Sequence, residues 1–249
     1  LTIDGNITMS GNGTIDISDN RTFDYSGNSF DVGTNTLTLT GGGTLANANA
    51  LTLSAGTFNV DDTMTVSGDI TLGGDCTLDI SSNETLTYSG SSLDISGSTL
   101  TFLGGGTLNN TNAVTFSTGT LAFTNDLTIS GAVTMSGDGT IDISDNRTFD
   151  YDGASFAVGT NTLTLTGGGT LENANALTFS TGTINVDDTM TVSGDITMSG
   201  NGTLDVSSNE TFSYSGASLA VGTNTLTFLG GGTLNNTNAV TFSTGTLAF

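Results

Sequence analysis

The chain has 249 residues, 35% of them hydrophobic and 36 of them glycine, with no proline, lysine or histidine. The formal charge of −22 argues against phosphate backbones and anionic membrane surfaces, so nucleic acid is not an expected partner. The apolar residues alternate regularly, which excludes a disordered glycine-rich polymer. With no proline to remove a backbone donor, strands can pair along the whole chain.

Targeting and redox signals are few. No apolar run approaches the length of a bilayer span, so membrane insertion is not expected, and no basic region followed by an apolar stretch opens the sequence as a signal peptide would. These features predict a mature or excised portion of a longer protein. The single cysteine, Cys76, cannot form an internal disulfide. Other copies of its sequence context carry Gly13, Gly139 and Gly202, so we interpret Cys76 as a turn residue rather than a reactive thiol.

A 63-residue repeat runs through the whole sequence. The segment from Leu127 matches the segment from Leu1, and Gly-Gly-Gly blocks at 41, 104, 167 and 230 halve this 126-residue period. The repeat predicts one continuous domain over residues 1–249, made of the tandem copies 1–63, 64–126, 127–189 and 190–249. Such self-similarity is typical of stacked units that bury a continuous core between neighbours.

Within the first copy, apolar residues separated by one residue predict short strands with the apolar side chains inward. In chain order these are Leu1/Ile3, Ile7/Met9, Ile15/Ile17, Phe23/Tyr25, Phe30/Val32, Leu37/Leu39, Leu45 alone, Leu51/Leu53 and Phe58/Val60. The paired positions exchange apolar for apolar between copies, as Ile7 and Val133 do, whereas flanking positions drift. Nine strands in each copy predict three coils of three strands, with about 21 residues per coil.

These strands predict an all-β fold, a parallel β-solenoid of about twelve coils and ~57 Å in length. An antiparallel meander remains the alternative, since the 126-residue super-period would let its equivalent residues stack. In the segment "TLTLTGGG" we expect Leu37 and Leu39 inward, Thr38 outward, and residues 41–43 to turn a corner with positive φ.

Two kinds of polar residue recur at predicted corners. Asn47 and Asn49 are predicted to adopt the left-handed conformation or to bond the backbone of the next coil, with a ligand site as the alternative. Their counterparts are Asn110, Asn112, Asn173, Asn175, Asn236 and Asn238. Asn-x-Ser/Thr sequences, which could accept glycans, begin at Asn6, Asn12, Asn20, Asn83, Asn109, Asn146, Asn201, Asn209 and Asn235.

The recurring acids could ligate calcium, but they are expected to be solvated instead. They are Asp61-Asp62, Asp187-Asp188, Asp16, Asp79, Asp142 and Asp205. The calcium nonapeptide G-G-x-G-x-D does not occur in register, and equivalent acids lie three coils, about 14 Å, apart. The same spacing weakens pairing of Arg21 and Arg147 with Glu84 and Glu210.

No residue set points to catalysis. Histidine and lysine are missing, and no acid stands in an apolar context that would shift its pKa. A sugar-cleaving acid pair, as some solenoid enzymes use, would break the repeat locally, and no copy departs in this way. The sequence therefore predicts no enzyme and no catalytic, cofactor-binding or metal-binding residue.

The units "TLTLTGGGTL", "NALTLS-GT" and "ITMSGNGTIDIS" resemble the filamentous-haemagglutinin and autotransporter-passenger class of bacterial surface β-solenoids. The resemblance implies an extracellular or cell-surface rod used for adhesion, surface coating, biofilm or fibre building. We therefore expect a structural solenoid that forms or belongs to a self-associating filament, with surface glycans as a further partner. The alternative is an ice- or carbohydrate-binding solenoid that uses outward threonines, although Thr8, Asp31, Thr52, Thr71 and Asp94 mix residue types on one face.

The ends of the chain predict the mode of self-association. A solenoid leaves unpaired backbone groups at its first and last coils, which capping helices, prolines or lysines usually protect. The sequence begins in strand phase at "LTI", ends in strand phase at "TLAF", and shows no atypical terminal copy. Head-to-tail stacking, or continuation of one covalent array, is the expected result.

Overall fold

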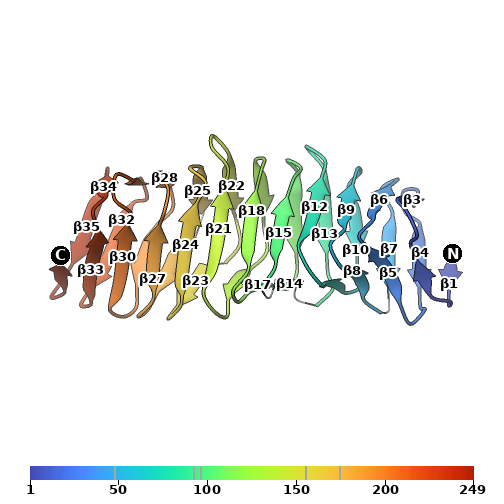
Figure 1. The fold of residues 1–249 in the computed structure, drawn as a ribbon, viewed down its shortest axis with the longest axis horizontal. Coiled ribbons are helices and arrows are strands. Elements are labelled where there is room, and N and C mark those ends of the chain that lie inside the picture. Colours follow the sequence, from blue (N-terminus) through green and yellow to red (C-terminus); the bar gives the residue numbers. More distant parts are fainter. Residues whose placement is uncertain (48, 92, 96, 155, 174) are drawn as a thin grey trace.

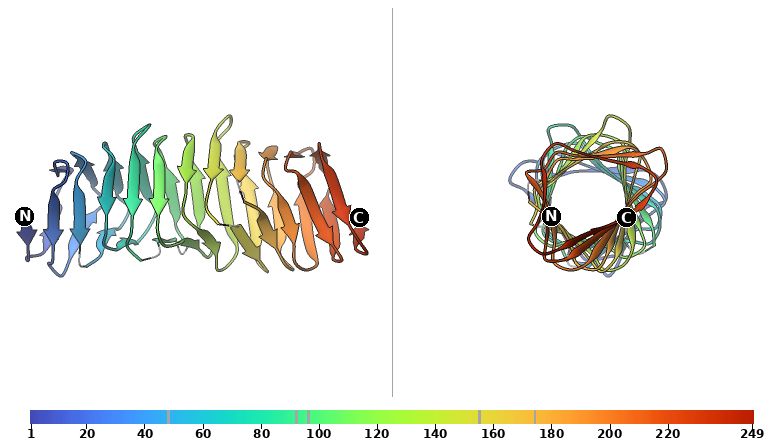
Figure 2. Two further views of the ribbon diagram at one scale, coloured as in Figure 1. Left: turned by 180° about the vertical axis from the view of Figure 1, so that it is seen from behind. Right: turned by 90° about the vertical axis from the view of Figure 1, so that its left-hand side faces the viewer.

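The computed structural model describes residues 1–47, 49–91, 93–95, 97–154, 156–173 and 175–249. The chain winds into a rod of twelve coils with its two termini at opposite ends (Figures 1 and 2). Each coil contributes one strand to each of three faces, here called faces one, two and three in chain order. All strand pairings among the described residues are parallel, as for β4 with β7 and β15 with β18, which confirms the solenoid and rules out the meander.

Face one is a twelve-stranded sheet. Its strands are β1 (Thr2–Ile3), β4 (Thr22–Tyr25), β7 (Thr44–Asn47), β10 (Met64–Val66), β13 (Thr85–Tyr88), β16 (Thr107–Asn110), β19 (Leu127–Ile129), β22 (Thr148–Tyr151), β25 (Thr170–Asn173), β28 (Met190–Val192), β31 (Thr211–Tyr214) and β34 (Thr233–Asn236).

Face two consists of a four-stranded and an eight-stranded sheet, which meet between β11 and β14. The first sheet holds β2 (Ile7–Thr8), β5 (Phe30–Gly33), β8 (Leu51–Leu53) and β11 (Ile70–Leu72). The second holds β14 (Leu93–Ile95), β17 (Val114–Phe116), β20 (Val133–Met135), β23 (Phe156–Gly159), β26 (Leu177–Phe179), β29 (Ile196–Met198), β32 (Ser218–Gly222) and β35 (Ala239–Phe242).

Face three is again a twelve-stranded sheet. Its strands are β3 (Gly13–Asp16), β6 (Thr36–Thr40), β9 (Thr57–Val60), β12 (Cys76–Ile80), β15 (Thr99–Phe102), β18 (Thr120–Phe123), β21 (Gly139–Ile143), β24 (Thr162–Thr166), β27 (Thr183–Val186), β30 (Gly202–Val206), β33 (Thr225–Gly230) and β36 (Thr246–Ala248).

The core runs unbroken along the inside of the rod. In β6, Leu37 and Leu39 are buried while Thr38 is partly exposed, which confirms the predicted alternation. Burial of a leucine side chain contributes about 1.5–3 kcal/mol, so two inward residues per strand supply most of the stabilisation. The aromatic side chains stack along the axis: the rings of Phe102, Phe123 and Phe149 have centroid separations of 5.0 and 4.1 Å.

Register on faces one and three drifts by two positions for every three coils. Thr22 pairs with Thr44, Thr44 with Thr65 and Thr65 with Thr87, so three coils lead from Thr22 to Thr87, two positions beyond its sequence equivalent Thr85. Because side chains alternate with a period of two, this drift keeps inward residues inward. It also makes the stacked columns run obliquely along the rod.

Glycines and asparagines turn the corners. Gly41 and Gly42 have φ values of 89° and 75°, which confirms the expected positive φ for these two glycines of the corner, whereas Gly43 does not adopt it. Asn20, with φ of 58°, occupies the left-handed region at the corner that leads to β4, and Asn83, Asn146 and Asn209 do the same in the other copies. The left-handed asparagines are thus not Asn47 and its counterparts.

The sequence suggested that Cys76 is a turn residue, and this prediction is wrong. Cys76 is the first residue of β12, points inward and is only 3% exposed. The reason lies in the preceding coil, where Leu53 stands at the position that Phe116 and Phe179 occupy in later copies. A smaller neighbour leaves room for a side chain where Gly139 lies against a phenylalanine ring, and burial raises the pKa of the Cys76 thiol.

Candidate functional site

The asparagine Asn47 bonds the next coil through its side-chain amide. Its position in β7 is the second inward one, opposite Tyr25 of β4, which explains why this strand shows a single apolar residue. Its Nδ2 donates to the carbonyl oxygens of Asn49 and Asp69 at 3.1 and 2.9 Å, and its Oδ1 accepts the Gly68 N–H at 3.0 Å. The same bonds recur at Asn110 and Asn173. These side chains are satisfied within the wall, so they offer a ligand little.

The second asparagine of each corner bonds in the opposite direction. Asn49 Nδ2 donates to the Gly27 carbonyl of the previous coil at 2.8 Å, and Asn112, Asn175 and Asn238 repeat this bond. Each corner is thus tied to the coil before it and to the coil after it. The prediction that these residues bond neighbouring coils is confirmed for the inner copies.

Many acids hold neighbouring corners together, a role that sequence reasoning missed. Asp62 Oδ2 accepts the Gly41 N–H of the previous coil at 2.8 Å, and Asp188 accepts the Gly167 N–H at 3.0 Å. Others accept N–H groups of the following coil, as Asp75 does from Thr99 at 2.7 Å. The signal in the sequence is an Asp or Asn at a constant spacing of about one coil from a corner N–H, as at Asn12, Asp75, Asp138 and Asn201.

Three carboxyl groups show how the wall sets their charge. The hydrogen bonds from Ser91 lower the pKa of Asp69. Desolvation raises the pKa of Asp150, and the nearby Asp152 and Glu172 add to the effect. Desolvation followed by repulsion from Asp61 raises the pKa of Asp79. Among the described residues, no three acidic or cysteine side chains come together as a metal site would require.

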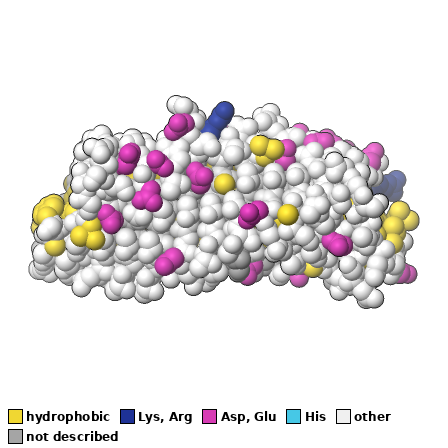
Figure 3. Space-filling model, viewed as in Figure 1, with side chains coloured by type: hydrophobic (Ala, Val, Ile, Leu, Met, Phe, Trp, Pro, Cys, Tyr) yellow, Lys and Arg dark blue, Asp and Glu magenta, His cyan; other side chains and the backbone are white. Residues whose placement is uncertain are grey.

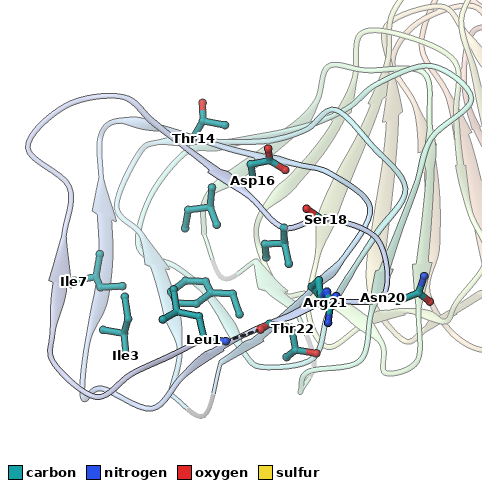
Figure 4. A pocket seen from close by; sticks show the side chains of 12 residues that line it. Leu1, Ile3, Ile7, Thr14, Asp16, Ser18, Asn20, Arg21 and Thr22 are labelled. Atoms are coloured by element: carbon teal, nitrogen blue, oxygen red, sulfur yellow. Dashed lines mark hydrogen bonds between the residues drawn. The ribbon is translucent and has the colours of Figure 1, made fainter.

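The N-terminal end of the rod is an open apolar hollow, here called the N-face. It is lined by Ile3, Ile7, Ile15 and Phe23 of the first two coils, and Leu1 lies at its rim, where its amino group donates to the Thr22 carbonyl at 3.2 Å (Figure 4). The hollow is the cross-section of the core without a coil to cover it. Its lining also includes the polar residues Thr14, Asp16, Ser18, Asn20, Arg21 and Thr22.

The C-terminal end, here called the C-face, is also apolar. Phe228, Leu234, Val240 and Leu247 line it, and Phe228 stacks on Phe249 with ring centroids 5.4 Å apart. Apolar side chains gather at both ends of the rod, whereas the side wall shows scattered acids (Figure 3). Of the five exposed large hydrophobic residues that the structure describes, four lie in the first or the last two coils: Leu1, Leu229, Phe242 and Phe249.

Charge differs between the two ends. Residues 211–249 contain no Asp, Glu, Lys or Arg, so the C-face and the coil behind it carry no charged side chain. Contact between two N-faces would bring like charges together, whereas contact between a C-face and an N-face would not. The charged side chains of the first two coils are those of Asp4, Asp16, Asp19, Arg21, Asp24 and Asp31.

No family model, curated protein or solved structure matches this chain. Within the described part of the chain, no helix is long and apolar enough to cross a membrane. The chain combines a wall braced by hydrogen bonds between coils, a continuous apolar core and apolar side chains at both ends.

Proposed function

We propose that this chain is a structural rod that forms, or belongs to, an extracellular filament or adhesive fibre. The observation that carries the proposal is the pair of open apolar end faces on a solenoid whose core continues without interruption between them. Polar side chains of the wall form hydrogen bonds between neighbouring coils, and such bracing suits an element that bears mechanical load. In this proposal the rod performs no catalysis and binds no cofactor.

The extracellular placement rests on the resemblance of the repeat units to bacterial surface β-solenoids and on the composition. The acidic surface keeps neighbouring rods apart and soluble, because like charges on two side walls repel each other. Repulsion of this kind falls off over a Debye length of about 10 Å at 0.1 M salt. Added salt should therefore promote lateral bundling and leave the axial contacts largely unchanged, because the C-face carries no charged side chain for the N-face to repel.

Imaging and sedimentation of the purified 249-residue chain test the proposal. At low salt we expect filaments one rod wide by negative-stain electron microscopy, and at high salt we expect bundles of the same filaments. Labelling of intact producing cells with an antibody to the chain should give a surface signal. A monodisperse 25.0 kDa species at every salt concentration, or labelling only after cell lysis, would contradict the proposal.

A second candidate function is binding of an ordered surface, such as ice or a crystalline polysaccharide, through threonine hydroxyls. Face two mixes residue types as expected, since Thr8 pairs with Asp31 and Asp31 with Thr52. Face three instead carries oblique runs of four outward threonines. The runs are Thr36, Thr57, Thr77 and Thr101; Thr99, Thr120, Thr140 and Thr164; and Thr162, Thr183, Thr203 and Thr227.

Thermal hysteresis and pull-down on insoluble polysaccharides test this second candidate. Binding through face three predicts loss of the signal when Thr140 is replaced by a bulky lysine, and retention when Thr71 on face two is replaced in the same way. Failure to detect either hysteresis or polysaccharide binding removes the candidate.

A further inference from the structure

The residues at the two ends of the rod match the residues that meet inside it wherever one 63-residue copy contacts the next. At each of these internal junctions a side chain on face two lies against a residue pair in the following coil. Two junctions use Phe116 with Met135 and Gly139, and Phe179 with Met198 and Gly202. The first junction uses Leu53 with Leu72 and Cys76. The size of the first residue thus sets the size of its partners.

The end faces carry the two halves of the phenylalanine type of junction. Phe242, equivalent to Phe179, ends β35 in the last coil and is 50% exposed, whereas Phe179 is 2% exposed. Met9 and Gly13 lie in the first coil, at the positions of Met198 and Gly202. A Cβ on Gly202 would approach the Phe179 ring to 2.2 Å, so glycine is required there by its neighbour. A Cβ on Gly13 would meet no phenylalanine, and its nearest neighbour would be the Met9 methyl group at 3.2 Å.

Gly5 in the first coil corresponds to inner glycines that lie close to the backbone of the previous coil. A Cβ on Gly68 would lie 1.8 Å from the carbonyl oxygen of Asn47, and one on Gly131 would lie 2.0 Å from that of Asn110. Nothing lies within 4 Å of the corresponding position on Gly5. The first coil therefore has the close-approach glycine although no described coil approaches it.

The C-face carries the asparagine that would complete this contact. Inner asparagines such as Asn173 donate to the next coil and accept its glycine N–H, Gly194 N–H in this case, at 3.0 Å. Asn236 keeps the local bond to the Asn238 carbonyl at 2.8 Å but is exposed, because no described coil follows it. Gly5 N–H stands at the position of Gly194 N–H.

We propose that the C-face of one copy of this chain binds the N-face of a second copy, head to tail, with Phe242 seated on Met9 and Gly13 and with Asn236 bonded to Gly5 N–H. This inference rests on the proposed filament function and adds the partner and the register. Extending the internal junctions by one period pairs Leu234 with Ile3, Val240 with Ile7 and Leu247 with Ile15 across the contact.

Polarity and charge favour this pairing over the others. Two N-faces in contact would oppose their aspartates, including Asp4 and Asp16, and would place glycine against glycine. Two C-faces would oppose Phe242 to Phe242 and leave Asn236 without a glycine N–H. Only the head-to-tail contact continues the parallel ladders, and it propagates because it is heterologous.

Variants of the two end faces test the inference by sedimentation velocity and electron microscopy, with the melting temperature of each variant measured by circular dichroism. Gly5→Val should leave folding unchanged and abolish assembly, because the added side chain would meet the Asn236 carbonyl of the next copy. Gly13→Ala should raise the concentration needed for assembly at least about tenfold, since its Cβ would press on the Phe242 ring.

A rescue variant distinguishes assembly in one specific register from non-specific hydrophobic association. Adding Phe242→Leu to Gly13→Ala reproduces the small-partner logic of the Leu53 junction and should restore assembly to within about threefold of the wild type. Thr71→Val, on the exposed wall, is the matched control and should assemble normally. A wild-type chain that stays monomeric sinks both this inference and the filament proposal. Assembly of all folded variants at wild-type concentration overturns the register alone and leaves the filament proposal standing.

Discussion

Equivalent residues in the inner coils and in the end coils of this rod have different surroundings although their sequences are nearly the same. A Cβ on Gly131 would lie 2.0 Å from the Asn110 carbonyl oxygen, whereas a Cβ on Gly5 would have nothing within 4 Å. Asn173 is buried with bonds to the next coil, and Asn236 is exposed. The difference teaches that most polar and glycine positions in the repeat serve the coil beside them, so their energetic value appears only when that coil is present.

Replacement of a glycine should give the largest difference in stability between the inner coils and the first coil. Gly131→Val places a side chain about where the Asn110 carbonyl oxygen lies, so we expect a loss of more than about 5 kcal/mol and local or complete unfolding. Gly5→Val in the monomer should change the melting temperature little. Thermal unfolding followed by circular dichroism measures both, and similar losses in the two variants would show that the inner glycines are not close-packed.

A charge placed in the core should cost almost as much. Leu37→Asp buries a carboxylate without a partner and should cost about 4 kcal/mol, whereas Thr38→Asp adds one more surface acid and should cost less than about 1 kcal/mol. Leu247→Asp, at the open C-face, should fall between them because Leu247 is only half-buried. Denaturant titration checks this order, and equal midpoints for Leu37→Asp and Thr38→Asp would contradict the inward assignment.

Removal of the corner asparagine should have a smaller effect. Asn173→Ala leaves the Gly194 N–H without its partner and removes one of two donors to the Asp195 carbonyl, which keeps the Leu177 N–H, so it should cost about 2 kcal/mol. The same change at Asn236 in the monomer should cost a few tenths of a kcal/mol, because water already reaches the groups it bonds. Hydrogen exchange at Gly194 provides the site-specific readout; unchanged protection there would refute the bond.

The smallest effect concerns charge. Desolvation raises the pKa of Asp150 in the folded state, so its ionised form destabilises the fold at any pH above its ordinary unfolded value of about 3.9. Asp150→Asn should therefore raise the melting temperature slightly at neutral pH. The gain should vanish in acid, where the protonated Asp150 of the wild type is as neutral as the asparagine of the variant. Asp24, the exposed equivalent in the first copy, is the control and should show no gain. A lower melting temperature of Asp150→Asn at neutral pH would show that the ionised Asp150 carboxylate stabilises the fold.

Much of the fold followed from the alternation of residue types. Pairs such as Leu37/Leu39 predicted strand positions and direction of side chains, and the 63-residue period predicted three strands per coil. The corners were harder, because the conformation of Asn20 and the bonds of Asp62 depend on atoms one coil away. Cys76 was misplaced for the same reason: its burial is set by Leu53, a neighbour in space rather than in sequence.

Cross-linking across the end faces tests most directly the central claim that the two ends form the same junction that the inner coils form. In the junction register Thr241 lies opposite Thr8 on the outer surface, as Thr115 lies opposite Thr134 inside the rod. A Thr8→Cys, Thr241→Cys double variant in a Cys76→Ala background, treated with a short thiol-specific cross-linker, should give a ladder of covalent multimers of the 25.0 kDa chain. Each single variant should give no ladder. Monomers only, or dimers as the largest product of the double variant, would contradict head-to-tail continuation of the solenoid.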